Sequence, residues 1–216
     1  PDSGVKRFGF DVTFPRRDGT AMVSTMRELL AQIPWKVAES QWNLIDSHDS
    51  ARILTLTQNP HVAHAALGMM MTYPGVPMAF AGDERDAVGV TGEESRTPMD
   101  WDAPEDAHCA TMSGYRDLLT LRSTSSALTH GGLRWVNVQA DAVAYLREDA
   151  NDRLLVVVAR QGGQHVRVTR DLLGGGDPQL VCGEGTMEPG DHGVLFTLPD
   201  AGYGIWRLGG LDVPRW

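Results

Sequence analysis

"NLIDSHDSAR", residues 43–52, is the stretch that decides how this chain is organised. Residues 41–46 are predicted to form a short buried strand that ends in a polar turn. Four ionisable side chains crowd that turn: Asp46, His48, Asp49 and Arg52. In parallel α/β folds, side chains just past the carboxyl end of a strand line the functional site. The turn is therefore the first candidate for function.

A second turn of the same kind lies one helix further along the chain. An apolar helix is predicted over residues 59–72, because Asn is a favourable N-cap and Pro a favourable first helical residue. The tripeptide at 73–75, Tyr-Pro-Gly, ends it, and residues 76–81 are predicted to form a strand before the polar turn at 82–84. Strand, helix and strand at this spacing form a βαβ unit with parallel strands.

Helices are predicted on both sides of this unit. Apolar residues recur at helical spacing between Thr20 and Ile33, where a proline follows. Asp102 and Glu105 resemble a capping box, which predicts a helix that continues to about Ser126.

The pattern changes beyond residue 131. Short runs of β-forming residues separated by turns predict an antiparallel, sandwich-like module of about 80 residues. The predicted strands are 134–138, 142–147, 154–160, 165–169, 194–198 and 204–208. The fold class is therefore α/β followed by all-β.

Composition excludes several classes of function. The chain has 216 residues and a formal net charge of -9, with 42% hydrophobic residues, which fits a globular protein of one or two domains. The acidic balance argues against a nucleic-acid partner. No apolar run approaches the ~18 residues of a membrane span. The chain starts Pro-Asp-Ser-Gly, so we expect that upstream sequence has been removed.

Four motifs resemble a known family in the family's own order. "NLIDSHDSARILT" (43–55) and "YPGVPMAFAGDE" (73–84) are similar to the ends of the seventh and eighth barrel strands of the α-amylase superfamily of glycoside hydrolases. "SRTPMDWD" (95–102) and "YRDLLTLR" (115–122) resemble its following loop and last barrel helix. The resemblance is strongest to the neopullulanase, cyclomaltodextrinase and maltogenic-amylase branch.

This resemblance implies an architecture. Residues 1–130 would be the last part of a (β/α)8 TIM barrel, and residues 131–216 a C-terminal antiparallel β-sandwich domain. Residues 1–16 are expected to hold the end of the sixth strand. A whole barrel takes about 250 residues, so it cannot close from this chain alone. We expect association through the open barrel edge, or a dimer in the full-length protein.

The resemblance also implies roles for particular residues. Asp49 matches the transition-state stabiliser and His48 a residue that binds sugar hydroxyls. Arg52 matches an arginine that would bind substrate or orient Asp49, and a purely structural ion pair is an equal alternative. Residues Gly82, Asp83 and Glu84 match a structural strand-end motif. Without the order of the motifs, a helix-capping Asp beside a core His would be the simpler interpretation of the pair.

Two carboxylates that the chemistry needs are absent. A retaining glycosidase uses a nucleophile and a separate acid/base carboxylate about 5 to 5.5 Å apart. In the family these come from the fourth and fifth barrel strands, the first in a GxRxD motif, and no such motif occurs here. The isolated chain is therefore predicted to be inactive, although the resemblance makes the parent protein a glycosidase.

The function implied is part of a retaining α-glucan hydrolase. Its substrates would be maltodextrins, cyclomaltodextrins or pullulan, cleaved at α-1,4 and, as an open alternative, α-1,6 bonds. The other hypothesis is a non-catalytic, amylase-like fragment that binds carbohydrate or protein. No cofactor or metal site is predicted, because His61 and His64 lack a third ligand, and calcium binding would depend on the missing part. A cytoplasmic location is expected, with an upstream signal sequence left open.

Overall fold

The computed structural model describes residues 3–7, 10–14, 16–104 and 108–210. The helices are α1 Gly19–Ala31, α2 Trp35–Ala38, α3 Ile53–Thr57, α4 Pro60–Thr72, α5 Cys109–Thr124, α6 Ser126–His130 and α7 Arg170–Leu173, with 3-10 turns η1 Asp83–Arg85 and η2 Glu94–Arg96. Within these ranges, every helix is too short or too polar to cross a bilayer.

The strands fall into two groups. The first group is β1 Ser3–Arg7, β2 Phe10–Phe14, β3 Trp42–Asn43 and β4 Val76–Pro77. The second is β5 Gly132–Val138, β6 Ala142–Glu148, β7 Arg153–Ala159, β8 Gln164–Val168, β9 Gln179–Gly183, β10 Thr186–Gly190, β11 Gly193–Leu198 and β12 Gly202–Arg207.

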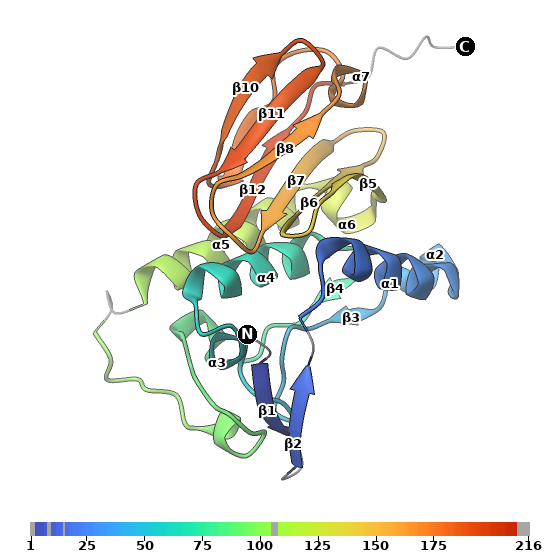
Figure 1. Cartoon of the computed structure of the whole chain (residues 1–216). Coiled ribbons are helices and arrows are strands. Elements are labelled where there is room, and N and C mark those ends of the chain that lie inside the picture. Colours follow the sequence, from blue (N-terminus) through green and yellow to red (C-terminus); the bar gives the residue numbers. More distant parts are fainter. Residues whose placement is uncertain (1–2, 8–9, 15, 105–107, 211–216) are drawn as a thin grey trace.

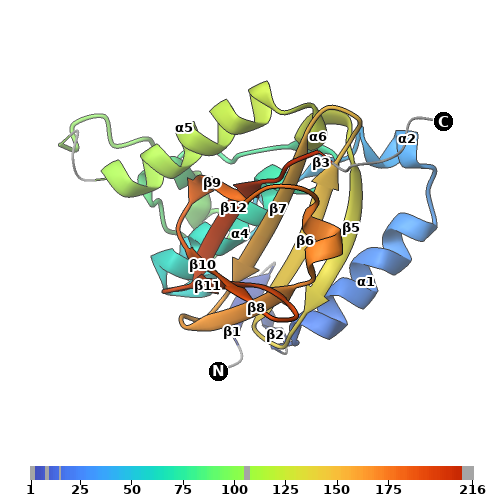
Figure 2. The same ribbon diagram turned by 90° about the horizontal axis from the view of Figure 1, so that it is seen from above.

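The molecule is layered (Figure 1). A three-stranded sheet, β10-β11-β8, faces a five-stranded sheet, β5-β6-β7-β12-β9, and all pairs within both are antiparallel. Helices α4 and α5 cover the other face of the larger sheet, and α1 runs along its β5 side (Figure 2). The predicted change to antiparallel strands after residue 131 is confirmed.

The larger sheet is buried on both faces, which explains its apolar sequence. In β7 every residue is buried, and alternate side chains point to opposite faces. Leu154, Val156 and Val158 pack in one core with α4 and α5, whereas Leu155 and Val157 pack in the other core, between the two sheets. A sheet covered on both faces produces a continuous apolar run rather than an alternating one.

Helix α4 is confirmed at both predicted ends. Asn59 caps it by accepting a hydrogen bond from the backbone N of His61 at 2.9 Å, and Pro60 is its first residue. The helix ends at Thr72, and Gly75 beyond it has a φ of 117°, which a residue with a side chain rarely adopts. Its apolar composition follows from its place against the larger sheet.

One buried arginine joins the helices to that sheet. Arg147 of β6 donates hydrogen bonds to the carbonyls of Leu128 at 3.2 Å and Gly131 at 2.9 Å, and also to the carbonyl of Thr72. These carbonyls lie at the C-terminal ends of α6 and α4, where helices leave acceptors unsatisfied. The core on this side therefore takes residues from both sides of position 130.

The predicted βαβ unit is present, with shorter strands than expected. β3 and β4 pair in parallel, with Trp42 opposite Val76. Each has only two residues, and Trp42 is 71% exposed, so the prediction of a buried strand over 41–46 was wrong. Among the described residues the two strands pair only with each other, so their outer edges have no strand partner.

The predictions for the first 16 residues and for the start of the helix after Asp102 were also wrong. β1 and β2 pair antiparallel, with Ser3 opposite Phe14, whereas the end of a sixth barrel strand would lie in a parallel sheet. Helix α5 begins at Cys109 rather than after Asp102, whose own backbone N donates to the side chain of Asp100 at 3.2 Å. Glu105, the second member of the proposed capping box, lies outside the described residues.

Candidate functional site

His48 and Asp49 lie on a tight turn beyond β3. The turn is closed by Ser50, whose hydroxyl accepts from the backbone N of Ser47 at 2.9 Å and whose own backbone N donates to the Ser47 carbonyl at 3.1 Å. The side chains of His48 and Asp49 remain 63% and 61% exposed, with the His48 Nε2 3.4 Å from Asp49 Oδ2. Two polar groups are thus presented to solvent on a backbone that is itself fixed.

Arg96, in η2, holds this pair from the side. Its Nε donates to the carbonyl of His48 at 3.0 Å, and its Nη2 pairs with Asp49 Oδ1 at 3.0 Å. A residue with a side chain at Gly92 could not fit, because its Cβ would lie 2.8 Å from the His48 carbonyl oxygen. The segment 91–96 therefore packs directly on the turn and fixes one oxygen of Asp49.

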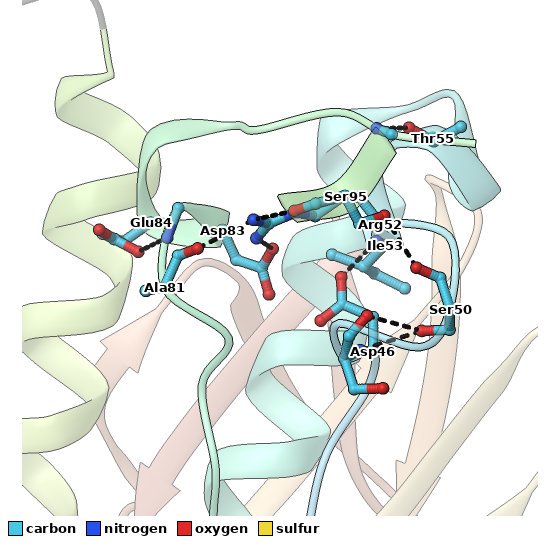
Figure 3. A network of polar contacts seen from close by, with 12 residues as sticks. Asp46, Ser50, Arg52, Ile53, Thr55, Ala81, Asp83, Glu84 and Ser95 are labelled. Atoms are coloured by element: carbon cyan, nitrogen blue, oxygen red, sulfur yellow. Dashed lines mark hydrogen bonds and ion pairs between the residues drawn. The ribbon is translucent and has the colours of Figure 1, made fainter. Parts of the chain in front are cut away.

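Arg52 is buried beneath the turn and is 2% exposed (Figure 3). Its Nη1 pairs with Asp83 Oδ1 at 2.7 Å, and its Nη2 donates to the carbonyls of Ser95 at 2.8 Å and Ala81 at 3.0 Å. The guanidinium also lies over the ring of Phe80, 3.7 Å from the centroid. Of the two roles left open for Arg52, this geometry favours the structural ion pair.

The turn after β4 is built around the same arginine. Gly82 has a φ of 106°, and a Cβ there would meet both terminal nitrogens of Arg52 at 3.2 and 3.3 Å. Glu84 accepts a hydrogen bond from the backbone N of Gly82 at 2.8 Å, so its carboxylate closes the turn. Asp83 is 5% exposed and directed at Arg52. Of the predicted strand-end residues, Gly82 and Asp83 thus lie against Arg52, and Glu84 holds the turn through Gly82.

Asp46 and Asp83 bring two buried carboxyl groups together. Asp46 Oδ2 accepts from the backbone N of Ile53 at 2.6 Å and so fixes the first residue of α3. Burial first, and then a hydrogen bond with Asp46, raise the pKa of Asp83 to about 7, although Arg52 acts in the opposite direction. The inner oxygens, Asp46 Oδ1 and Asp83 Oδ2, have no other partner.

Metal ligands do not gather in this part of the chain. Across residues 16–104 and 108–210, no three His, Cys, Asp or Glu side chains converge in a way that could hold an ion. His64, weighed above as a ligand with His61, instead has its Nε2 3.0 Å from the hydroxyl of Thr111.

Sequence reasoning missed two residues of the site. Arg96 lies in the segment 95–102, which was compared with a family loop but given no role. Asp46 was noted only as one of several ionisable residues in its turn. No spacing rule links Arg96 to Asp49, which are 47 positions apart, so only the folded chain reveals their contact.

Comparison with known proteins decides the family. The alpha-amylase catalytic domain matches residues 13–120, half of the chain. The chain belongs to the α-amylase family. This is a family of glycoside hydrolases, and the matched residues include both turns of the site.

Relatives of this α-amylase-family chain extend the match beyond residue 120. Neopullulanase 2 of Thermoactinomyces vulgaris is 33% identical over 179 residues, which are 81% of this chain and 30% of the relative. A cyclomaltodextrinase of a Bacillus species is 32% identical over 158 residues, 71% of this chain and 27% of the relative. The chain therefore spans about a third of the length of these relatives.

The fold of the α-amylase-family chain also matches solved structures. The debranching enzyme of Nostoc punctiforme superposes with a TM-score of 0.78 at 24% identity, over 90% of this chain and 41% of that one. At this identity the likeness concerns the fold alone.

Proposed function

We propose that this chain supplies the sugar-binding turn of an α-glucan hydrolase. The observation that carries the proposal is the pair His48 and Asp49, exposed on a rigid turn of a chain that belongs to a glycoside hydrolase family. Relatives named neopullulanase and cyclomaltodextrinase support an α-glucan as the substrate class. Maltodextrins, cyclomaltodextrins and pullulan are the polymers and rings to test.

Asp49 is proposed to stabilise the transition state. A carboxylate that accepts hydrogen bonds from ring hydroxyls strengthens them as the sugar flattens toward an oxocarbenium ion, so these contacts lower the barrier. His48 would bind a hydroxyl beside it, and Arg96 would hold Asp49 Oδ1 so that Oδ2 stays available. Arg52 would act from below, through the buried ion pair, rather than on the substrate.

A retaining mechanism needs two further carboxylates. The nucleophile and the acid/base must stand about 5 to 5.5 Å apart on opposite faces of the bond. We assign neither role to a residue of this chain, which lacks the GxRxD motif. The chain alone is therefore proposed to bind glucan without cleaving it, and cleavage is assigned to the longer protein that carries it.

The same proposal includes the architecture. β3, α4, β4 and α5 would be the last elements of a (β/α)8 barrel within residues 1–130, and residues 131–216 would form a C-terminal β-sandwich domain. The parallel pairing of β3 with β4 supports the first part, and the facing antiparallel sheets support the second. In the longer protein, further barrel strands would cover the open sides of β3 and β4.

A non-catalytic role is the second candidate. The missing nucleophile and acid/base carboxylates favour it for the chain as it stands, because a binding fragment needs only the exposed turn. The two candidates share a prediction of glucan binding and differ in turnover by the longer protein.

The test is glucan binding by the 216-residue chain. We expect maltohexaose to bind, and Asp49→Asn to weaken binding about tenfold to one hundredfold, because a charge-assisted hydrogen bond is lost. Calorimetric titration measures both. Asp191→Asn is the matched control, since Asp191 is exposed in the hairpin between β10 and β11, and it should bind like the parent chain.

Two outcomes would overturn parts of the proposal. Equal affinity of the parent chain and Asp49→Asn would remove Asp49 from the sugar site. Reducing-sugar release from maltodextrin by the purified chain, abolished in Asp49→Asn, would show that catalytic carboxylates are present after all.

A further inference from the structure

The strongest unexplained feature of the molecule is a pair of buried carboxyl oxygens without partners. They are Asp46 Oδ1 and Asp83 Oδ2, and they are the only such side-chain atoms among the described residues. A buried polar atom without a hydrogen bond destabilises the folded state, and more so when it is charged. Two in one place call for a physical explanation.

The outer oxygen of each group is already satisfied. Asp46 Oδ2 accepts from the backbone N of Ile53 at 2.6 Å, and Asp83 Oδ1 from Arg52 at 2.7 Å. Figure 3 shows the two carboxyl groups side by side between these donors. The unsatisfied oxygens are therefore the inner ones, and the two carboxyl groups interact with each other.

The charges around the two carboxyl groups also do not balance. Two carboxylates face one guanidinium, that of Arg52, so one negative charge would remain buried without compensation. The other titratable groups around the pair are Glu84, Asp86, His64 and Tyr115. None supplies a positive charge at neutral pH, because Glu84 and Asp86 are carboxylic acids, Tyr115 is a phenol, and burial lowers the pKa of His64.

We propose that Asp46 and Asp83 share one proton between Oδ1 and Oδ2, and that this proton ties the turn carrying His48 and Asp49 to the turn after β4. A single proton satisfies both inner oxygens and removes the uncompensated charge. The two residues are thus positioning residues: they touch no substrate, and they fix the backbone from which His48 and Asp49 project. Only the consequence for sugar binding rests on the proposed function.

A metal ion and a water molecule are the two other possible partners of the inner oxygens, and both fit less well than a proton. A metal ion needs more ligands than two oxygens, and no third ligand converges among the described residues. A water molecule would have about the right room in the adjacent cavity of about 20 Å³ lined by Asp83, Asp86 and Tyr115. A water, however, leaves both carboxylates charged against one arginine.

The shared proton makes stability depend on pH in a defined direction. The pKa of Asp83 is raised from 3.8 to about 7, so the folded chain holds a proton that the unfolded chain has lost. The stabilisation is therefore greatest on the acid side and disappears as the pH rises through about 7. Most carboxylates paired with arginine show the opposite dependence, because their pKa is lowered.

The direct test is a carbon-13 NMR titration of the aspartate carboxyl groups in the unmodified chain. We expect one group of the Asp46–Asp83 pair to titrate near pH 7, and Asp46→Asn to move the titration of Asp83 well to the acid side, because the amide then donates in place of the proton. Titration of both groups in the ordinary acid range would overturn the proposal, as would a calcium-dependent rise in Tm with both groups ionised.

Thermal melting supplies a second measurement with a matched control. The Tm of the parent chain should fall as the pH rises from about 4 to about 7, the interval between the unfolded and folded pKa of Asp83, and Asp46→Asn should lack that fall. Glu84→Gln removes a carboxylate from the same turn without touching the pair, so it should keep the fall. An identical pH profile for the parent chain and Asp46→Asn would contradict the shared proton.

Maltohexaose titrations separate this inference from the proposed function. If the glucan binds, its affinity should decrease above about pH 7 in the parent chain but not in Asp46→Asn. If no glucan binds at any pH while the carboxyl titration is as expected, the shared proton stands and the proposed function fails.

Discussion

At the scale of single residues, the site separates exposed groups from the buried groups that hold them. His48 and Asp49 face solvent, whereas Arg52 and Asp83 below them are nearly inaccessible. Rigidity of the exposed pair therefore comes from contacts that the substrate would never meet. Functional groups held within a fraction of an ångström need this kind of supporting layer.

Substitution of Arg96 tests whether a neighbouring residue that holds Asp49 in place contributes to sugar binding. We expect Arg96→Gln to weaken maltohexaose binding about threefold to tenfold, because Asp49 loses the guanidinium that fixes Oδ1. The free energy of unfolding should change by less than about 1 kcal/mol, since both partners are more than half exposed. Calorimetric titration and urea unfolding measure the two effects separately.

Arg85→Gln is the control for this prediction. Arg85 is another arginine of the same region, and its Nη2 donates to the carbonyl of Asp100 at 2.8 Å without contact to Asp49. Weaker glucan binding in both variants would indicate a general effect of charge and count against a specific role for Arg96.

At the scale of elements, α4 is placed by its fit against β12. Gly68 allows that contact, because a Cβ there would lie 2.4 Å from the ring of Tyr203. Thr72, one turn further on, has its hydroxyl 2.5 Å from that of Tyr145 on β6. Helix α4 is therefore fixed to the larger sheet at two points.

A pair of glycine substitutions tests this fit. Gly68→Ala should destabilise the chain by about 1–3 kcal/mol, because α4 or Tyr203 must move. Gly114→Ala, on α5, should leave stability unchanged or raise it by about 0.5–1 kcal/mol, since its Cβ would lie 3.6 Å from the Tyr203 hydroxyl oxygen and alanine favours helix. Urea unfolding of both variants measures the difference, and equal effects would contradict the close packing of α4.

At the scale of the whole molecule, one side remains uncovered. Trp42, Leu44 and Val76, on or next to β3 and β4, are 71%, 46% and 47% exposed. Strands whose outer edges are unpaired and which carry exposed apolar residues are prone to pair with another chain. This side is where the proposed barrel would continue.

We therefore expect the isolated chain to self-associate. Light scattering should give an apparent mass that rises with protein concentration, and Trp42→Ser should reduce that rise. Trp101→Ser is the control, because Trp101 is 80% exposed but belongs to the loop between η2 and α5 and to neither strand. A monodisperse monomer at all concentrations would contradict the prediction of self-association.

Much of the fold could be predicted because the signals are local. The start of α4 at Asn59-Pro60 and its end before Tyr73 follow from capping and from φ restrictions of neighbouring residues. β6 and β7 follow from runs of β-branched and apolar residues. β9 and β10 were missed because both are mostly exposed: the apolar run of β9 is only three residues long and ends at a Gly, and β10 contains Pro and Gly.

The sequence by itself determined the family motifs, the parallel unit around α4 and the turn that carries His48 and Asp49. Only the tertiary structure decided that Arg96 holds Asp49, that Arg52 is buried, and that Asp46 faces Asp83. These contacts join residues 31 to 47 positions apart or lie between separate turns. Their energies depend on burial and on distance in space, which local sequence patterns do not encode.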